Sequence, residues 1–149
     1  MEFNMQLDVE NQLCSAQAFT GSATVSENAY QKQSAVQDLS IGRRIAIAVF
    51  FSAAGTGTTH TLDAIQADVT ALTTNKEVLA SVSIATTAIN LGYPVEVPIP
   101  AGVMSRQFLG FQHTATGGTT TATIDAYLVP QDEIAEYFKS FPKVVDAKI

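Results

Sequence analysis

Apolar residues at every second position constrain the fold of this chain more than any other feature. The clearest run covers residues 43–52, where bulky apolar residues alternate with mostly small ones. The bulky set is Ile45, Ile47, Val49 and Phe51, and the set between them is Arg44, Ala46, Ala48, Phe50 and Ser52. A period of two is typical of a β-strand, and two apolar faces indicate a central strand that is covered on each side.

Similar alternation predicts further strands along the chain. These strands are expected at 13–19, 23–25, 60–70, 78–85, 95–99, 106–115 and 121–129. Between 60 and 70 the apolar positions shift by one after Ala64, as a β-bulge would cause. Pro98 and Pro100 fall at outward positions, which places the strand at 95–99 at a sheet edge because proline cannot donate to a neighbour.

Turn signals and connection lengths complete the prediction of the fold. A Thr-Gly-Gly-Thr loop predicts a hairpin between the last two strands. Most connections are short, and strands do not alternate with helices, which favours antiparallel pairing. We therefore predict an all-β fold, an antiparallel β-sandwich over residues 1–131 that forms a jelly roll of about eight strands.

The C-terminal segment, 132–149, follows a different pattern. Asp132 and Glu133 precede a helical run that Pro142 ends, so we predict a short amphipathic helix over 132–141 and a tail, not a separate domain. The apolar stripe of this helix comprises Ile134, Tyr137, Phe138 and Phe141. The stripe can dock on its own sandwich or on a neighbouring molecule, and we expect it to support assembly.

The N-terminal segment, about 1–11, contains a second apolar alternation without turn residues. Its members are Phe3, Met5, Leu7 and Val9. Such a segment can add as a strand to the sheet edge of a partner, and a frayed terminus is the alternative. These four residues and the helix stripe are the predicted partner interface.

Charge is scarce and excludes several classes of function. The chain has 8 Lys and Arg against 14 Asp and Glu, a net charge of −6, which argues against nucleic-acid binding. Only Glu96, Arg106 and Asp125 are charged between 78 and 131. A neutral, threonine-rich surface suits packing against other proteins, because a Thr side chain loses less conformational entropy than Lys or Glu when a contact orders it. A sparsely charged monomer surface is the alternative.

Membrane and export signals are weak as well. Three charge-free stretches, 45–62, 78–95 and 107–124, are laced with polar residues and do not read as bilayer helices. The first residues lack the basic start and apolar run of a signal peptide, so we expect synthesis in a cytoplasm.

Patterns that would indicate catalysis or metal binding are weak. His60 and His113 are far apart in the sequence, and Cys14 is the only cysteine. Asp63 and Asp68 are explained more simply as the solvated face of one strand. We expect Cys14 to be a buried apolar side chain, and we expect no catalytic residue, no cofactor and no metal site.

Several short pieces occur in a distinctive order and spacing. They are ATVSEN at 23–28, DLSIG at 38–42, LG at 91–92, VPIPAG at 97–102, RQFLGF at 106–111, GGTTT at 117–121 and IDAYL at 124–128. Over about 15–129 the chain thereby resembles the capsid cement, or decoration, proteins of tailed bacteriophages. It departs from them at Gln112-His113, where a more aromatic strand end is expected, and in the helix at 132–141.

This resemblance implies a structural virion protein with a jelly-roll fold and no enzymatic activity. Such a protein binds the outer surface of an icosahedral head and clamps neighbouring major capsid subunits. The expected partners are the major capsid protein and the chain itself, as a homodimer or homotrimer, with no membrane or small-molecule substrate. The expected location is the outside of the virion, after synthesis in the cytoplasm of a host bacterium.

Two other functions compete with this interpretation. A carbohydrate-binding jelly roll, either a lectin or a phage receptor-binding domain, would use aromatic platforms; Tyr30, Tyr93 and Tyr127 are candidates, although the chain has no Trp. A hydrolase or isomerase of the cupin type would need a cluster of histidines with a carboxylate.

Overall fold

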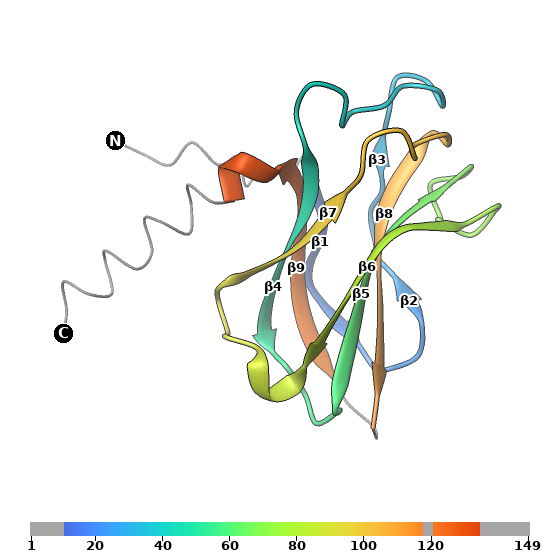
Figure 1. Cartoon of the computed structure of the whole chain (residues 1–149). Helices are drawn as coiled ribbons and strands as arrows, with labels where there is room; N and C mark the ends of the chain where they lie inside the picture. The colour runs from blue at the N-terminus through green and yellow to red at the C-terminus, as the bar shows by residue number, and fades with distance from the viewer. Residues whose placement is uncertain (1–10, 118–120, 135–149) are drawn as a thin grey trace.

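Two antiparallel sheets face each other in the computed structural model of the chain, which describes residues 11–117 and 121–134 (Figure 1). The four-stranded sheet has the order β1 (Gln12–Phe19), β9 (Ala122–Pro130), β4 (Ile45–Ala53), β7 (Pro94–Ile99). The five-stranded sheet has the order β2 (Thr24–Val25), β8 (Phe108–Thr116), β5 (Thr59–Ala67), β6 (Glu77–Ala85), and β3 (Tyr30–Gln31) also pairs with β8. A short 3-10 helix, η2 (Thr86–Ala88), follows β6.

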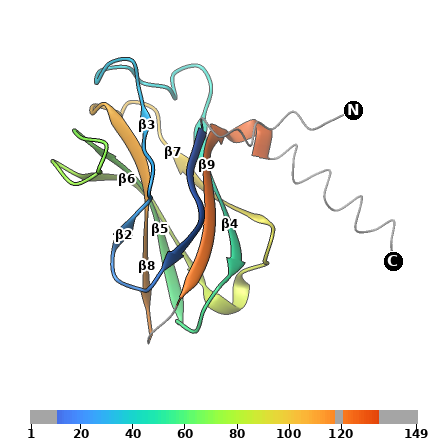
Figure 2. The same ribbon diagram turned by 180° about the vertical axis from the view of Figure 1, so that it is seen from behind.

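The strand pairs are nested, and this nesting identifies the topology. β1 pairs with β9, β2 and β3 pair with β8, β4 pairs with β7, and β5 pairs with β6. The chain is thus a long hairpin folded over itself, which is the jelly-roll arrangement. The predicted antiparallel sandwich is confirmed, and Figure 2 shows its two layers from behind.

The predicted hairpin between the last two strands is wrong. β8 lies in the five-stranded sheet and β9 in the four-stranded sheet, so these two strands do not pair with each other. A glycine-rich turn predicts only that the chain reverses, and it does not say whether the two strands join the same sheet. The two-residue strand β3 was also missed because it is too short to show alternation.

The bulky face of β4 forms the centre of the core, as predicted. Ile47, Val49 and Phe51 are buried between the sheets together with Leu62 and Phe111 of the opposite sheet. Burial of each such side chain stabilises the fold by about 1.5–3 kcal/mol relative to exposure.

The small face of β4 is covered as well, which confirms the expected central strand. Ala46, Ala48 and Phe50 form a second apolar cluster with Val129 and Ile134 on the outer face of the four-stranded sheet. Ile134 belongs to the first helical turn after β9, which the structure describes up to this residue. Its side chain is therefore buried against its own sandwich.

The predicted bulge in β5 is found only in part. The register between β5 and β6 shifts between Ala64 and Ile65, which leaves Leu79 of β6 without an opposite residue. The register between β5 and β8 is unbroken over the same stretch. Ile65 and Ala67 pack instead with Leu72 in a separate cluster, so the shift in the apolar pattern reflects a second covered face.

Candidate protein-binding surface

The exposed edge of the five-stranded sheet and the segment that follows it form a surface without charged residues. We call residues 78–95 the neutral surface; it comprises most of β6, η2, the turn after η2 and the first residues of β7. Val78 is 53% exposed and Leu91 is 56% exposed, although both are apolar. Ser81, Ser83 and other small polar residues lie between them. Covering such a surface desolvates no ionised group.

The charged residues beside the neutral surface are bonded locally. Arg106 Nη2 lies 3.3 Å from Glu77 Oε2, and Arg106 Nη1 lies 3.1 Å from Asp68 Oδ1. The hydrogen bond from Arg106 lowers the pKa of Glu77, and hydrogen bonds from Asn75 and Arg106 lower the pKa of Asp68. These carboxylates are ionised at neutral pH, and Arg106 opposes their charge.

The other two charged residues between 78 and 131, Glu96 and Asp125, also have hydrogen-bond partners. Gln131 Nε2 donates to Glu96 Oε1 at 2.9 Å, and the backbone N–H of Ala16 donates to Asp125 Oδ1 at 2.5 Å. Each of these two carboxylates thus has a local hydrogen-bond partner, and neither residue belongs to the neutral surface at 78–95.

The core beneath β6 is incompletely covered. Ala80, Val82 and Ile84 pack against the main core but remain only partly buried. By contrast, the core-facing residues Val97 and Ile99 of β7, the edge strand of the other sheet, are almost fully buried. A partner strand placed beside β6 would remove the remaining apolar area of these three side chains from water.

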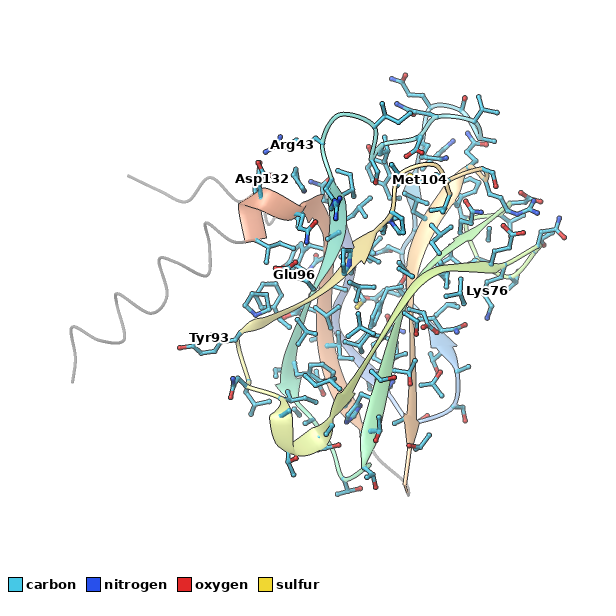
Figure 3. All side chains as sticks on the ribbon, in the orientation of Figure 1. Arg43, Lys76, Tyr93, Glu96, Met104 and Asp132 are labelled. Atoms are coloured by element: carbon cyan, nitrogen blue, oxygen red, sulfur yellow. The ribbon has the colours of Figure 1, made fainter. Side chains whose placement is uncertain are left out.

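A small groove opens between β6 and β7 and holds one of the three candidate tyrosines. The groove has a volume of about 240 Å³, and its lining includes Ile84, Asn90 and Tyr93. Figure 3 shows the Tyr93 side chain pointing away from the body of the sandwich. Tyr30 lies on β3 of one sheet and Tyr127 on β9 of the other. The ring of Tyr127 packs against the ring of Phe50, with the two ring centroids 6.1 Å apart. The three tyrosines thus come from separate elements and do not build one sugar platform.

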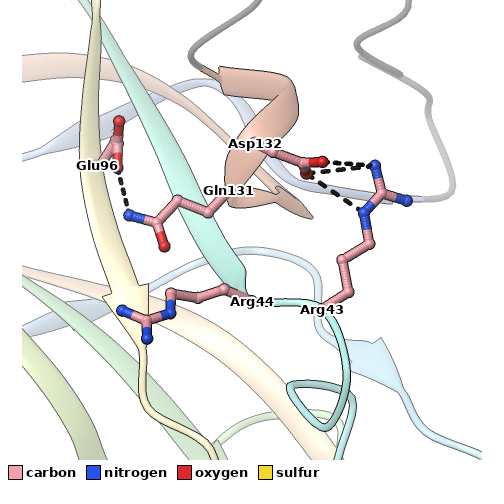
Figure 4. Close-up of a pocket in the computed structure, with 5 residues that line it drawn as sticks. All are labelled: Arg43, Arg44, Glu96, Gln131 and Asp132. Carbon is pink, nitrogen blue, oxygen red and sulfur yellow. Dashed lines mark hydrogen bonds and ion pairs between the residues drawn. The ribbon is translucent and has the colours of Figure 1, made fainter.

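A larger groove, of about 470 Å³, marks the point where the C-terminal turn meets the sandwich (Figure 4). The backbone N–H of Gln131 donates to the Arg44 carbonyl at 2.8 Å, and its side chain reaches Glu96. Arg43 Nη2 lies 3.2 Å from Asp132 Oδ1 and 3.1 Å from Glu133 Oε2. The groove therefore mixes both signs of charge, and its contacts anchor the turn that carries Ile134.

The eight predicted interface residues have different outcomes. Ile134 is almost fully buried on its own sheet. The other seven, Phe3, Met5, Leu7, Val9, Tyr137, Phe138 and Phe141, lie outside the described residues, so their role stays a prediction.

The two histidines, which are far apart in the sequence, lie side by side in the structure. β5 and β8 are neighbours, and His60 Nδ1 lies 2.8 Å from His113 Nε2 inside the core. Burial lowers the pKa of both side chains, and that of His113 falls to about 4 because His60 lies beside it as well. The pair is neutral at pH 7 and closed off from solvent, so it has no access to a substrate in solution.

Cys14 is buried, as predicted. Burial and, to a smaller extent, the nearby charge of Asp125 raise the pKa of its thiol to about 12. The thiol is therefore protonated at neutral pH and is a poor nucleophile.

The interpretation of Asp63 and Asp68 as one solvated face is wrong. Asp63 is buried and accepts a hydrogen bond from Gln112 at 3.2 Å, whereas Asp68 lies beyond the end of β5 in the ion pair with Arg106.

Comparison of the sequence with protein-family models and with curated proteins finds no match. Within 11–117 and 121–134, no three His, Cys, Asp or Glu side chains gather where they could hold a metal ion. In the same ranges no helix has the length and hydropathy needed to cross a bilayer.

The sequence indicated that 78–131 is poor in charge and that the strand at 95–99 is an edge strand, but it did not indicate that β6 is an edge strand as well. That information depends on strand order, which short strands of similar composition do not encode locally. The histidine contact was missed for the same reason, since it arises from the pairing of β5 with β8.

Proposed function

We propose that this protein is a structural virion protein that cements an icosahedral head by binding its outer surface and clamping neighbouring major capsid subunits. The observation that carries the proposal is the neutral surface on a rigid jelly roll, in which Leu91 and Val78 are exposed apolar residues. The resemblance of 15–129 to phage decoration proteins supports the same function.

A shell filled with DNA is under internal pressure and fails first at the joints between subunits. A protein that strengthens these joints must cover them with a broad, stiff contact and must tolerate many copies of itself nearby. The two-layer sandwich supplies stiffness because its core side chains interlock. The neutral surface reduces repulsion between crowded copies of a chain whose net charge is −6.

The first test measures binding to empty heads assembled from the major capsid protein encoded in the genome that carries this sequence. We expect co-sedimentation of the wild-type chain with these heads. A genome that encodes no major capsid protein, or heads that fail to bind the chain, would contradict the proposal.

A matched pair of variants then tests the contact surface. Leu91 lies on the neutral surface, and Ile41, which is 73% exposed, lies in the loop before β4. We expect Leu91→Glu to weaken head binding at least tenfold, because a carboxylate at the contact must be desolvated. We expect Ile41→Glu to bind like the wild type. The reverse result would place the contact away from the neutral surface.

The N-terminal segment has a separate role in this proposal. Deletion of residues 1–10 is expected to leave the sandwich folded and to weaken binding to heads, because the segment adds a strand to a capsid partner. Unchanged binding would show that the segment is not part of the interface.

A glycan array screened with the full chain tests the carbohydrate-binding alternative. A reproducible hit together with no head binding would favour that function.

A further inference from the structure

Three of the four edges of the two sheets carry features that oppose pairing with another strand. β7 contains Pro94 and Pro98, which cannot donate hydrogen bonds. β1 has two register shifts against β9, and Ala16 within it has a φ of 48°. β2 and β3, which together flank β8, are two residues long. Prolines, irregularities and very short strands are the usual protection of sheet edges.

The fourth edge, β6, carries only one such feature, the register shift at Leu79 near the start of the strand. This strand is nine residues long, contains no proline and carries no charge after Glu77. In the described part of the chain it pairs only with β5, and the next strand in sequence, β7, joins the opposite sheet. Backbone N–H and C=O groups therefore line a long, neutral edge that can accept another strand.

We propose that β6 is a self-association edge, at which a second copy of this chain adds its own β6 in antiparallel orientation. The two five-stranded sheets then become one continuous sheet across a twofold axis. Isologous pairing of this kind closes after two copies and leaves no further edge to extend. This inference does not depend on the proposed function, because it concerns only the contact between two copies.

The sequence of β6 is complementary to itself when the twofold axis passes through Val82. Val82 then lies opposite Val82 of the second copy, and Ala80 lies opposite Ile84, all on the partly covered core face. Ser81 lies opposite Ser83 on the outer face, where both are exposed. Neutral cross-strand pairs of this kind stabilise a sheet, and no like charges face each other.

The irregularity in β6 does not disturb this register. The residue without an opposite partner on β5 is Leu79, and the five central residues of the proposed pairing, 80–84, follow it with an unbroken register. A second copy, which carries the same neutral strand, therefore matches this edge along its regular portion.

The first experiment measures the mass of the full chain by light scattering at 5–100 µM. A mass of about twice 15.8 kDa is expected. A monomer at the highest concentration, or a trimer, would overturn the proposal. The same measurement after deletion of residues 1–10 is expected to give the dimer again, and a monomer there would mean that the N-terminal segment makes the contact instead.

Charge substitutions then test the edge itself. Ser81→Lys with Ser83→Lys places four lysines next to one another across the twofold axis, and we expect the dissociation constant of the dimer to rise at least 100-fold. Ser22→Lys with Ser34→Lys is the matched control, because both serines are exposed and lie beside β2 and β3 at the opposite edge of the sheet. The control is expected to remain a dimer. A dimeric β6 variant would overturn the proposal.

A charge-swap experiment tests the predicted register. Ser81→Glu with Ser83→Glu is also expected to be monomeric alone, but an equimolar mixture of the Glu and Lys variants is expected to form a heterodimer, because each Lys then faces a Glu. A mixture that stays monomeric would contradict the antiparallel β6 pairing. Near-UV circular dichroism checks that each variant is folded, and Ser83→Lys alone provides the same test if either double variant unfolds.

Discussion

Inside the core, His60 and His113 share a single hydrogen bond that links two strands of the five-stranded sheet. Because His60 Nδ1 and His113 Nε2 lie 2.8 Å apart, one ring donates an N–H and the other accepts it. The ring of Phe51 packs on His60 at 5.3 Å, and the ring of Phe19 packs on His113 at 5.2 Å. Protonation of both histidines would place two N–H groups against each other in an apolar setting, so the folded state favours the neutral pair.

The free energy of unfolding is expected to fall as the pH falls from about 6.5 toward 4. Burial lowers the pKa of both histidines in the folded state, to about 4 for His113, so the unfolded chain binds protons in this range that the folded chain does not. One such histidine lowers the unfolding free energy by roughly 1.4 kcal/mol per pH unit. Above pH 6.5 this contribution is constant.

Chemical denaturation at pH 5, 6 and 7 measures this dependence. His113→Gln keeps a side chain that can hydrogen-bond to His60 but does not titrate, so its stability is expected to change less between pH 7 and 5. Asp68 and Glu77 contribute little here, because the pKa values of both carboxyls are lowered from values already below 5. An equal pH dependence in wild type and variant would show that His113 is not the titrating group.

Gly110 of β8 is required by close packing rather than by backbone conformation. A Cβ atom at this position would overlap the Cδ1 atom of Leu72, which is fully buried over the outer face of the sheet. We expect Gly110→Ala to lower the unfolding free energy by about 1–3 kcal/mol because Leu72 must move out of its cluster. Gly110→Ala combined with Leu72→Ala is expected to show a smaller loss than the sum of the two single changes, and additive losses in thermal unfolding would argue against the contact.

At the scale of single elements, a buried lysine fixes the loop that joins β3 to β4. Lys32 Nζ donates to the carbonyl oxygens of Ala35 at 2.9 Å and Gln37 at 2.6 Å, although burial lowers the pKa of this amine. The ammonium group thus hydrogen-bonds two backbone carbonyl groups of the loop at once, and hydrogen bonds from a charged donor are stronger than those between neutral groups. The loop therefore holds its shape even though Val36 at its tip is 84% exposed.

Lys32→Met is expected to release this loop and to lower the unfolding free energy by about 1–3 kcal/mol. Elastase cleavage after Val36 is the sensitive measurement, because cleavage requires local opening of the loop. Lys76→Met serves as the control, since Lys76 is exposed and bonds only to the Gln112 side chain among its described contacts. Cleavage rates that do not differ between the two variants would mean that Lys32 does not hold the loop.

The C-terminal stripe is expected to divide into two functions. Ile134 is buried with Ala46 and Ala48 on the outer face of its own sheet, so Ile134→Ala should lower the unfolding free energy by about 2–4 kcal/mol. Phe138→Ala with Phe141→Ala is expected to weaken binding to heads or between copies more than it lowers stability. Denaturation and co-sedimentation of both variants separate these effects, and a large stability loss with unchanged association in the double variant would contradict the division.

Alternation predicted the elements better than it predicted their partners. The apolar faces of β4 identified a central strand, and the prolines of β7 identified an edge, because each pattern records the burial of its own strand. The hairpin of β8 with β9 was wrong, and the contact of His60 with His113 was missed, because both depend on which strands become neighbours. That choice follows from the nested topology of the whole chain, which no local pattern contains.

For the whole molecule, the two proposed surfaces lie next to each other, and this has a consequence for head binding. If β6 forms the contact between copies, the rest of the neutral surface, residues 86–95, is the part left for contact with the shell. A dimer would then present two identical shell-binding segments related by a twofold axis. Once one segment is bound, the second binds as an intramolecular event at high effective concentration, which increases the overall affinity without any new contact.

The variant with Ser81→Lys and Ser83→Lys should therefore bind empty heads about 100-fold more weakly than the wild type, although residues 86–95 are unchanged. The variant with Ser22→Lys and Ser34→Lys carries the same added charge and should bind like the wild type. The contact through residues 86–95 should change little in strength between 50 and 500 mM salt, because this segment holds no charged residue. Mixing the Lys variant with the Glu variant should restore tight binding together with the dimer. If the Lys variant is monomeric but binds heads as tightly as the wild type, one copy alone clamps the joint and the dimer contributes nothing to head binding.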